Sequence, residues 1–167
     1  MAKSKLMSTV LTVVVFAIAF AYVEASVVVY LRHLSGAMQP TINKNEILWL
    51  FPGIVFLEPK TAIKLITNSQ LLQVEQFREA ATLVMLATVA FLAGKKLRTR
   101  IGYFFLAFGI WDIFYYVFLR LILGWPARLT DLDIFFLLPT PWVGPVFVPL
   151  IISSLLIFGS LVVLFFT

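Results

Sequence analysis

The chain has 167 residues, of which 62% are hydrophobic and 13% are charged, and its mean hydropathy is +1.03. Because soluble domains use roughly 45–50% apolar residues, this composition excludes a soluble globular protein and indicates an integral membrane protein. The single histidine and the absence of cysteine exclude disulfides, thiolate catalysis and a haem held by two histidines of one copy. The net charge of +5 then reflects membrane topology and attraction to lipid headgroups, and no nucleic-acid partner is expected.

Four transmembrane helices are expected, since each needs about 20 apolar residues and no room remains for a sizeable soluble domain. The first helix is predicted over residues 8–34. Lys3 and Lys5 ahead of an apolar run are also compatible with a cleaved signal peptide. The run continues through residues 26–34, however, and a copy of it lies mid-chain, so a retained helix is expected.

A long connection, residues 35–68, follows the first helix. Its two apolar runs, residues 47–51 and 54–57, are too short to span and are expected to be interfacial or re-entrant segments. The second helix is predicted over residues 70–94, with Ser69 as its N-cap. Its first third is polar, so only the part from Ala80 onward is expected to lie in lipid.

A basic hairpin loop at residues 95–100 leads to a third helix over residues 101–123, which ends at Gly124-Trp125-Pro126. A second connection contains Pro139, Pro141 and Pro145. The fourth helix is predicted over residues 149–167.

Two parts of the chain read as copies of one another. Residues 19–24, residues 29–32 and Gly36 recur as residues 107–112, residues 117–120 and Gly124, at the offset that separates Glu24 from Asp112. Residues 46–52 recur at residues 133–139, at an offset that is one residue shorter, as a single deletion would produce. A unit with two spans leaves the membrane on the side it entered, so the fold class predicted is an all-α membrane protein built as two parallel two-helix repeats. Repeat one covers about residues 1–96 and repeat two about residues 97–167, within a single membrane domain.

Charge density predicts the orientation. Six basic residues crowd into the N-terminal tail and one short loop: Lys3, Lys5, Lys95, Lys96, Arg98 and Arg100. The positive-inside rule places this side, with both termini, in the cytoplasm of a cell-membrane protein.

Two acids within the apolar helices, Glu24 and Asp112, are the leading candidates for a site, because a charge inside the membrane is costly and usually faces the interior of the protein with a partner. Arg32 and Arg120 follow them at equal spacing and are expected to pair across the pseudo-two-fold axis or with Glu46 and Asp133. One interpretation is a set of ion pairs that lock the repeats together. The other is a polar chamber that opens outward, lined by these two acids, the two arginines and Glu79. In that chamber one of two facing acids keeps its proton, and the pair binds a cation or relays protons.

Other residues are weaker candidates. Tyr115 or Tyr116 can hydrogen-bond a carboxylate across the site. His33 is most simply a solvated residue at a helix end, although with acids of the connections it would complete a metal site. A quinone, a carotenoid or another apolar cofactor is conceivable, but no spacing marks one, so the cofactor stays unknown. Alanines at intervals of four, Ala17, Ala21 and Ala25, indicate close helix packing.

Several strings of this sequence carry a resemblance: residues 23–32, residues 111–116, residues 124–126, Asp131 with Asp133, and residues 139–145. They resemble a pattern in prokaryotic four-helix membrane proteins that have no assigned activity. The resemblance covers about half the chain and implies a prokaryotic membrane protein, without implying an activity.

The leading functional hypothesis is a non-catalytic accessory or scaffolding subunit of a membrane complex. The alternative is a small transporter or ion- or proton-binding protein that uses Glu24 and Asp112. The third is a membrane enzyme acting on a lipid or apolar substrate at the outer face. Expected partners are the lipid bilayer and either other membrane subunits or further copies of the chain.

Overall fold

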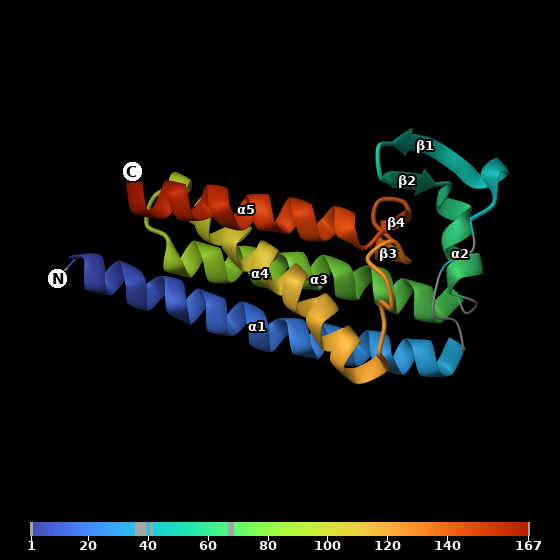
Figure 1. The fold of residues 1–167 in the computed structure, drawn as a ribbon, viewed down its shortest axis with the longest axis horizontal. Helices are drawn as coiled ribbons and strands as arrows, with labels where there is room; N and C mark the ends of the chain where they lie inside the picture. Colours follow the sequence, from blue (N-terminus) through green and yellow to red (C-terminus); the bar gives the residue numbers. More distant parts are fainter. Residues whose placement is uncertain (1, 36–39, 41, 67–68, 167) are drawn as a thin grey trace.

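The computed structural model describes residues 2–35, 40, 42–66 and 69–166. Within them, four helices are long and apolar enough to cross a membrane: α1 (Ala2–Ser35), α3 (Ser69–Ala93), α4 (Leu97–Leu123) and α5 (Phe147–Phe166). Both chain termini and the α3–α4 turn lie at one end of these helices, and the strands lie at the other (Figure 1). The prediction of a mostly helical chain with four helices long and apolar enough to span a membrane is confirmed.

The helix boundaries differ from the expected ones at the end where the termini lie. α1 begins at Ala2 rather than at residue 8, and α4 begins at Leu97, so most of the expected basic loop is helical. Arg100 stabilises the short turn that remains. Its Nε donates to the carbonyl oxygen of Gly94 at 2.9 Å, and its guanidinium lies 3.6 Å from the ring centroid of Phe91.

α4 is the central helix and packs against α1, α3 and α5. Small residues allow these close contacts, as in many membrane proteins. Ala17, Ala21 and Ala25 of α1 are fully buried. On the other side of α4, Gly109 lies against α5 so closely that an added Cβ would be 2.8 Å from the carbonyl oxygen of Ser153.

The two connections at the other end form one antiparallel sheet. Its strands are β1 (Ile47–Phe51), β2 (Ile54–Leu57), β3 (Leu132–Phe136) and β4 (Trp142–Pro145), in the order β1-β2-β4-β3. The hairpins join through β2 and β4, where Val55 pairs with Val143. The expectation of an all-α fold is therefore corrected, because residues 47–51 and 54–57, which were predicted as interfacial or re-entrant segments, form strands of a sheet. β1 pairs with β2, and β2 pairs on its other side with β4 of the hairpin that is distant in sequence, so β2 has a partner strand on both sides.

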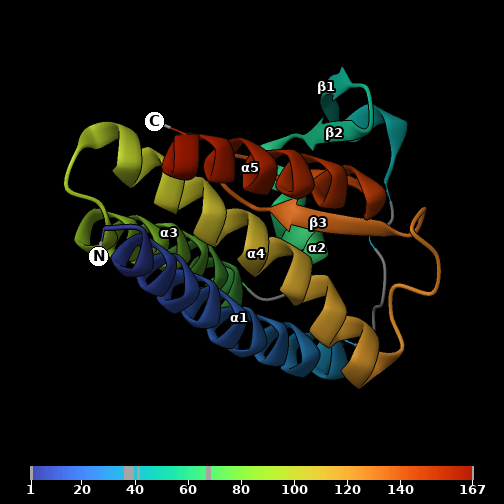
Figure 2. The same cartoon turned by 60° about the vertical axis from the view of Figure 1, so that its left-hand side comes forward.

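The β3–β4 hairpin is anchored in the helical part. β3 runs alongside α5 in Figure 2, and the ring of Phe136 stacks on that of Phe108 in α4, with 6.4 Å between their centroids. Short helical segments complete the strand end: η1 (Lys44–Glu46), η2 (Pro59–Thr61) and α2 (Ala62–Leu65). As a result, residues of β3 and of the first connection reach the strand-end halves of α1 and α3.

Candidate functional site

A cavity of about 440 Å³ lies where α1, α3, β3 and the first connection meet. Its wall carries three cationic side chains, which are Arg32, Lys64 and Arg78. It also carries four carboxylates, which are Glu46, Glu75, Glu79 and Asp133. The rest of the wall is mainly apolar. The volume is in the range of roughly 300–1,000 Å³ typical of small-molecule sites.

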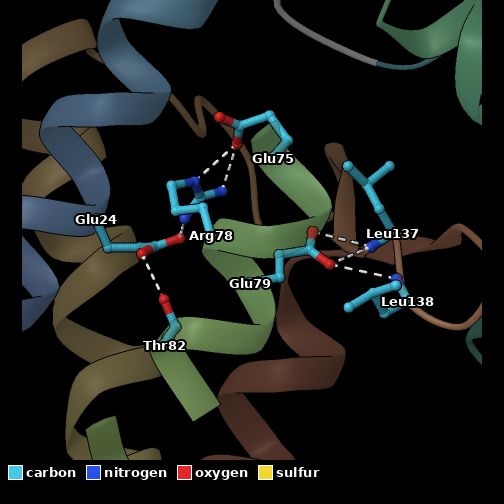
Figure 3. A network of polar contacts seen from close by, with 7 residues as sticks. All are labelled: Glu24, Glu75, Arg78, Glu79, Thr82, Leu137 and Leu138. Atoms are coloured by element: carbon cyan, nitrogen blue, oxygen red, sulfur yellow. Dashed lines mark hydrogen bonds and ion pairs between the residues drawn. The ribbon is translucent and has the colours of Figure 1, made fainter. Parts of the chain in front are cut away.

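Arg78 of α3, which lines this cavity, connects two carboxylates (Figure 3). It forms an ion pair with Glu24 of α1, and it also contacts Glu75, with Nε and Nη2 at 2.8 and 2.7 Å from Oε2. Thr82, one turn further along α3, donates to the other oxygen of Glu24 at 3.2 Å. Glu24 and Glu75 are buried, so one guanidinium is shared between two enclosed acids.

Glu79 points away from Arg78, toward the end of β3 (Figure 3). Its carboxylate accepts backbone N–H groups of Leu137 at 2.9 Å and of Leu138 at 3.2 Å. These amides lie just beyond the last residue of β3, where the strand ladder no longer uses them. Among the described residues Glu79 has no ion-pair partner.

Asp133 of β3 pairs with Arg32 of α1, with Oδ1 2.9 Å from Nη2. Tyr116 of α4 donates to its other oxygen at 3.1 Å. The Arg32 guanidinium also stacks 3.6 Å from the ring centroid of Trp125. Burial raises the pKa of Asp133 to about 6, against the opposing effects of Arg32 and Tyr116.

At the outer edge of the cavity, Lys64 of α2 forms an ion pair with Glu46 of η1. The hydrogen bond from Lys64 lowers the pKa of the Glu46 carboxyl. Lys64 is 65% exposed at its side chain, so this pair faces outward while the arginine pairs are enclosed.

The predicted pairing of Glu24 with Asp112 is not found. Asp112 accepts a hydrogen bond from Ser153 of α5 at 2.8 Å, and neither acid bonds to the other among the described residues. Each acid instead bonds to the next long helix along the chain. The reason is that α3 brings Arg78 to Glu24 and α5 brings Ser153 to Asp112, so neither acid needs the other as a partner.

Arg120 also departs from its expected role. Its Nη1 donates to the carbonyl oxygens of Gly124 at 2.5 Å and Pro126 at 2.9 Å. Gly124 ends α4 with a φ of +67°, a conformation that glycine adopts without the steric cost of a Cβ. Arg120 therefore caps a helix and does not line the cavity. Gly36, the expected repeat partner of Gly124, lies outside the described residues.

His33 does not support the metal hypothesis. Its Nδ1 lies 2.8 Å from the carbonyl oxygen of Val29 in its own helix. Among the described residues, no group of three or more His, Asp or Glu side chains could hold a metal ion.

Of the predicted site residues, the structure brings Arg32, Glu46, Glu79 and Asp133 to the cavity wall. Glu24 and Tyr116 bond to residues of that wall. Sequence reasoning missed Glu75, Arg78, Lys64 and Thr61. The polar first third of α3 is a signal for Glu75 and Arg78, but it has no counterpart in the second half of the chain, so the repeat pattern of the sequence does not mark them.

Comparison of the chain with protein-family models, with curated proteins and with solved structures finds no match. The resemblance to prokaryotic four-helix membrane proteins therefore stays a prediction.

Taken together, the geometry combines a walled volume, enclosed charges of both signs and an apolar surface. Such a site can bind and orient a small amphipathic molecule.

Proposed function

We propose that this protein is a ligand-binding membrane protein, of the transporter or solute-binding class. Its site is the cavity where α1, α3, β3 and the first connection meet. The observation that carries the proposal is the cavity of about 440 Å³ with seven acidic or basic side chains in its wall. If the ion pairs served only to hold elements together, they would not need to surround a volume of this size, because protein interiors are otherwise close-packed.

The elements that form the wall are consistent with a site reached from the outer leaflet. Apolar side chains of α1 and α3, such as Leu31 and Leu71, share the wall with Arg32 and Glu79. A ligand with a polar head and an apolar body would fit both parts of this wall.

Filling the cavity tests the proposal. In Leu31→Trp the larger ring would occupy the cavity, whereas in the control Leu121→Trp it would replace an exposed side chain of α4. The probes are 4-phenylbutylammonium, 4-phenylbutanol and 4-phenylbutylphosphonate, which share one apolar part and differ in charge. Calorimetric titration into protein in dodecyl maltoside, corrected with protein-free micelles, measures binding.

We expect at least one probe to bind to the wild type and to Leu121→Trp, and to lose affinity in Leu31→Trp by about tenfold or more. Binding that is equal in both variants, or no binding of any probe to the wild type, would contradict a ligand site in this cavity.

An accessory subunit is the second candidate, and the exposed edge of the sheet favours it. β1 is an edge strand, and Trp49, Leu50 and Phe51 are all more than half exposed. An apolar strand whose outer edge has no partner strand readily pairs with another chain. Purification from the native membrane in mild detergent should then retain a partner protein. Leu50→Lys should release this partner, whereas the control Leu129→Lys, at an exposed residue of the second connection, should retain it. Recovery of a lone chain from both would count against this role.

The proposed setting is the cell membrane of a prokaryote, with both termini in the cytoplasm and the cavity on the outer side. The basic residues of the N-terminal tail and of the α3–α4 turn support this orientation.

Two parallel repeats, with their division at about residue 96, also remain a proposal. It is supported by the sheet order, in which each connection supplies one hairpin and the second strands of the hairpins pair at the centre. The helices are less symmetric, because α5 packs extensively on α4 whereas α3 contacts α1 only slightly.

A further inference from the structure

The charges around the cavity do not balance. Counting Glu24 behind Arg78, five carboxylates accompany three cationic side chains. The residues outside the described ranges do not change this count, because residues 36–39, 41, 67 and 68 carry no ionisable side chain. With all groups ionised, two negative charges remain without a cationic partner, and an enclosed charge of this kind is costly.

The excess negative charge lies on α3. Arg78 is shared between Glu24 and Glu75, and it contacts only Oε2 of Glu75. The other oxygen of Glu75 accepts no hydrogen bond from the described residues. Among the described residues, Glu79 is bound only by backbone N–H groups, which leaves acceptor capacity on its two oxygens. Both carboxylates line the cavity.

An independent observation points to a ligand in the same cavity. Thr61 of η2 lines the cavity and is 2% exposed, yet its hydroxyl has no hydrogen-bond partner in the described structure. A buried hydroxyl without a partner is uncommon, because it loses its bonds to water without replacement. A ligand that donates to Thr61 Oγ1 would restore that bond.

From these observations we propose that the cavity binds an organic cation, an amine in its ammonium form. This inference rests on the proposed function and names its ligand class. The ammonium group donates to the carboxylates of Glu75 and Glu79, and Thr61 provides a further acceptor. The apolar part of the ligand lies against Leu31 and Tyr115.

An organic cation fits this wall better than a metal ion does. Divalent metal ions need several oxygen ligands placed around one point, and the described residues offer no such group. The four wall carboxylates are spread over η1, α3 and β3, and they are already engaged by cationic side chains or by backbone amides. An ammonium group needs only a few acceptors at hydrogen-bond distance.

The three phenylbutyl probes test the ligand class directly. We expect 4-phenylbutylammonium to bind most tightly, about tenfold or more above the alcohol, since hydrogen bonds between charged groups are stronger than neutral ones. In Glu79→Gln we expect that preference to fall by about tenfold. Glu58→Gln is the matched control, because Glu58 pairs with Lys60 and is not part of the cavity wall.

Thr61→Val provides a second test that does not remove a charge. It should weaken binding of 4-phenylbutylammonium and, at the same time, raise the unfolding temperature of the ligand-free protein, because it removes a buried hydroxyl without a partner. A role in structure alone predicts no change in binding. If Glu79→Gln fails to fold, this variant carries the test.

The outcomes separate the two proposals. If 4-phenylbutanol or 4-phenylbutylphosphonate binds as tightly as the ammonium probe, and Leu31→Trp abolishes that binding, the cation proposal is wrong while the ligand site stands. If Leu31→Trp has no effect on any probe, both proposals fail. A wild-type preference for the ammonium probe that Glu79→Gln and Thr61→Val leave unchanged would also overturn the cation proposal.

Discussion

Arg78 is the residue on which most of the enclosed charge depends. It contacts Glu24 and Glu75, both buried, and it is itself only 21% exposed at its side chain. Enclosed ion pairs add little net stability, because desolvation offsets their attraction, but removing one partner leaves an uncompensated charge. We therefore expect the loss of Arg78 alone to reduce stability much more than the loss of Arg78 together with both of its acidic partners.

Replacing Arg78 alone should therefore destabilise the protein strongly. We expect Arg78→Met to lower the free energy of unfolding by about 3–5 kcal/mol. The control Arg98→Met, at an exposed residue of the first turn of α4, should change it by less than about 0.5 kcal/mol. Denaturant titration in detergent, followed by the tryptophan signal, measures both.

The triple variant Arg78→Met with Glu24→Gln and Glu75→Gln checks the cause. Because it removes the charge together with both of its partners, it should recover most of the lost stability. If it is as unstable as Arg78→Met, packing of the side chain, rather than uncompensated charge, explains the loss.

Asp133 gives a prediction about pH. Burial raises the pKa of its carboxyl to about 6 in the folded protein, so the folded state holds this proton more tightly than the unfolded state does. The contribution to stability is therefore largest at low pH and decreases as pH rises from about 4 to about 6, by roughly 3 kcal/mol in total. The measurement is the free energy of unfolding across this window in the wild type and in Asp133→Asn.

The variant cannot titrate at this position, so its stability should fall less over the same window. Parallel pH profiles for the two proteins would show that Asp133 keeps an ordinary pKa.

Among the elements, the contact of α4 with α5 depends on Gly109. A Cβ at this position would meet Ile157 Cγ1 and the Ser153 carbonyl oxygen, each at 2.8 Å. We expect Gly109→Val to separate the two helices and to lower the free energy of unfolding by about 1–3 kcal/mol. The same denaturant titration measures it.

Gly159 of α5 supplies the control, because nothing lies within 4 Å of its added Cβ. Gly159→Ala should be neutral or slightly stabilising, since alanine favours the helix. Equal stability of Gly109→Val and the wild type would mean that the α4–α5 contact is not limited by this close approach.

For the molecule as a whole, the orientation can be tested without removing any native thiol, because the chain contains no cysteine. Asn45→Cys and Lys96→Cys are exposed and lie at opposite ends of the helices. A membrane-impermeant maleimide should label Asn45→Cys in intact cells and Lys96→Cys only after permeabilisation. The opposite pattern would place the cavity in the cytoplasm.

The sequence predicted some parts of the site because their signal is local. Glu79 and Arg32 stand out as charges within or next to apolar helices, and both reach the cavity wall. Glu46 and Asp133 were found from their matching positions in the two connections. Asp112 shows the limit of this reasoning, because a buried acid can be satisfied by a single serine that hydropathy does not mark.

The sheet shows the same limit at the level of elements. The apolar runs at residues 47–51 and 54–57 are visible in the sequence, and their bounds coincide with those of β1 and β2. Their pairing with β4 is not visible, because it depends on a hairpin that only the packing of the helices brings close.

Hydropathy and composition alone were sufficient to predict the four helices that are long and apolar enough to span a membrane, because transfer of apolar surface into lipid depends on each segment separately. The partners of the charged residues required the folded structure. Arg78 reaches Glu24, and Glu79 reaches the end of β3, because of how α1, α3 and the β3–β4 hairpin pack. Such contacts join residues far apart in the chain, and no local pattern specifies them.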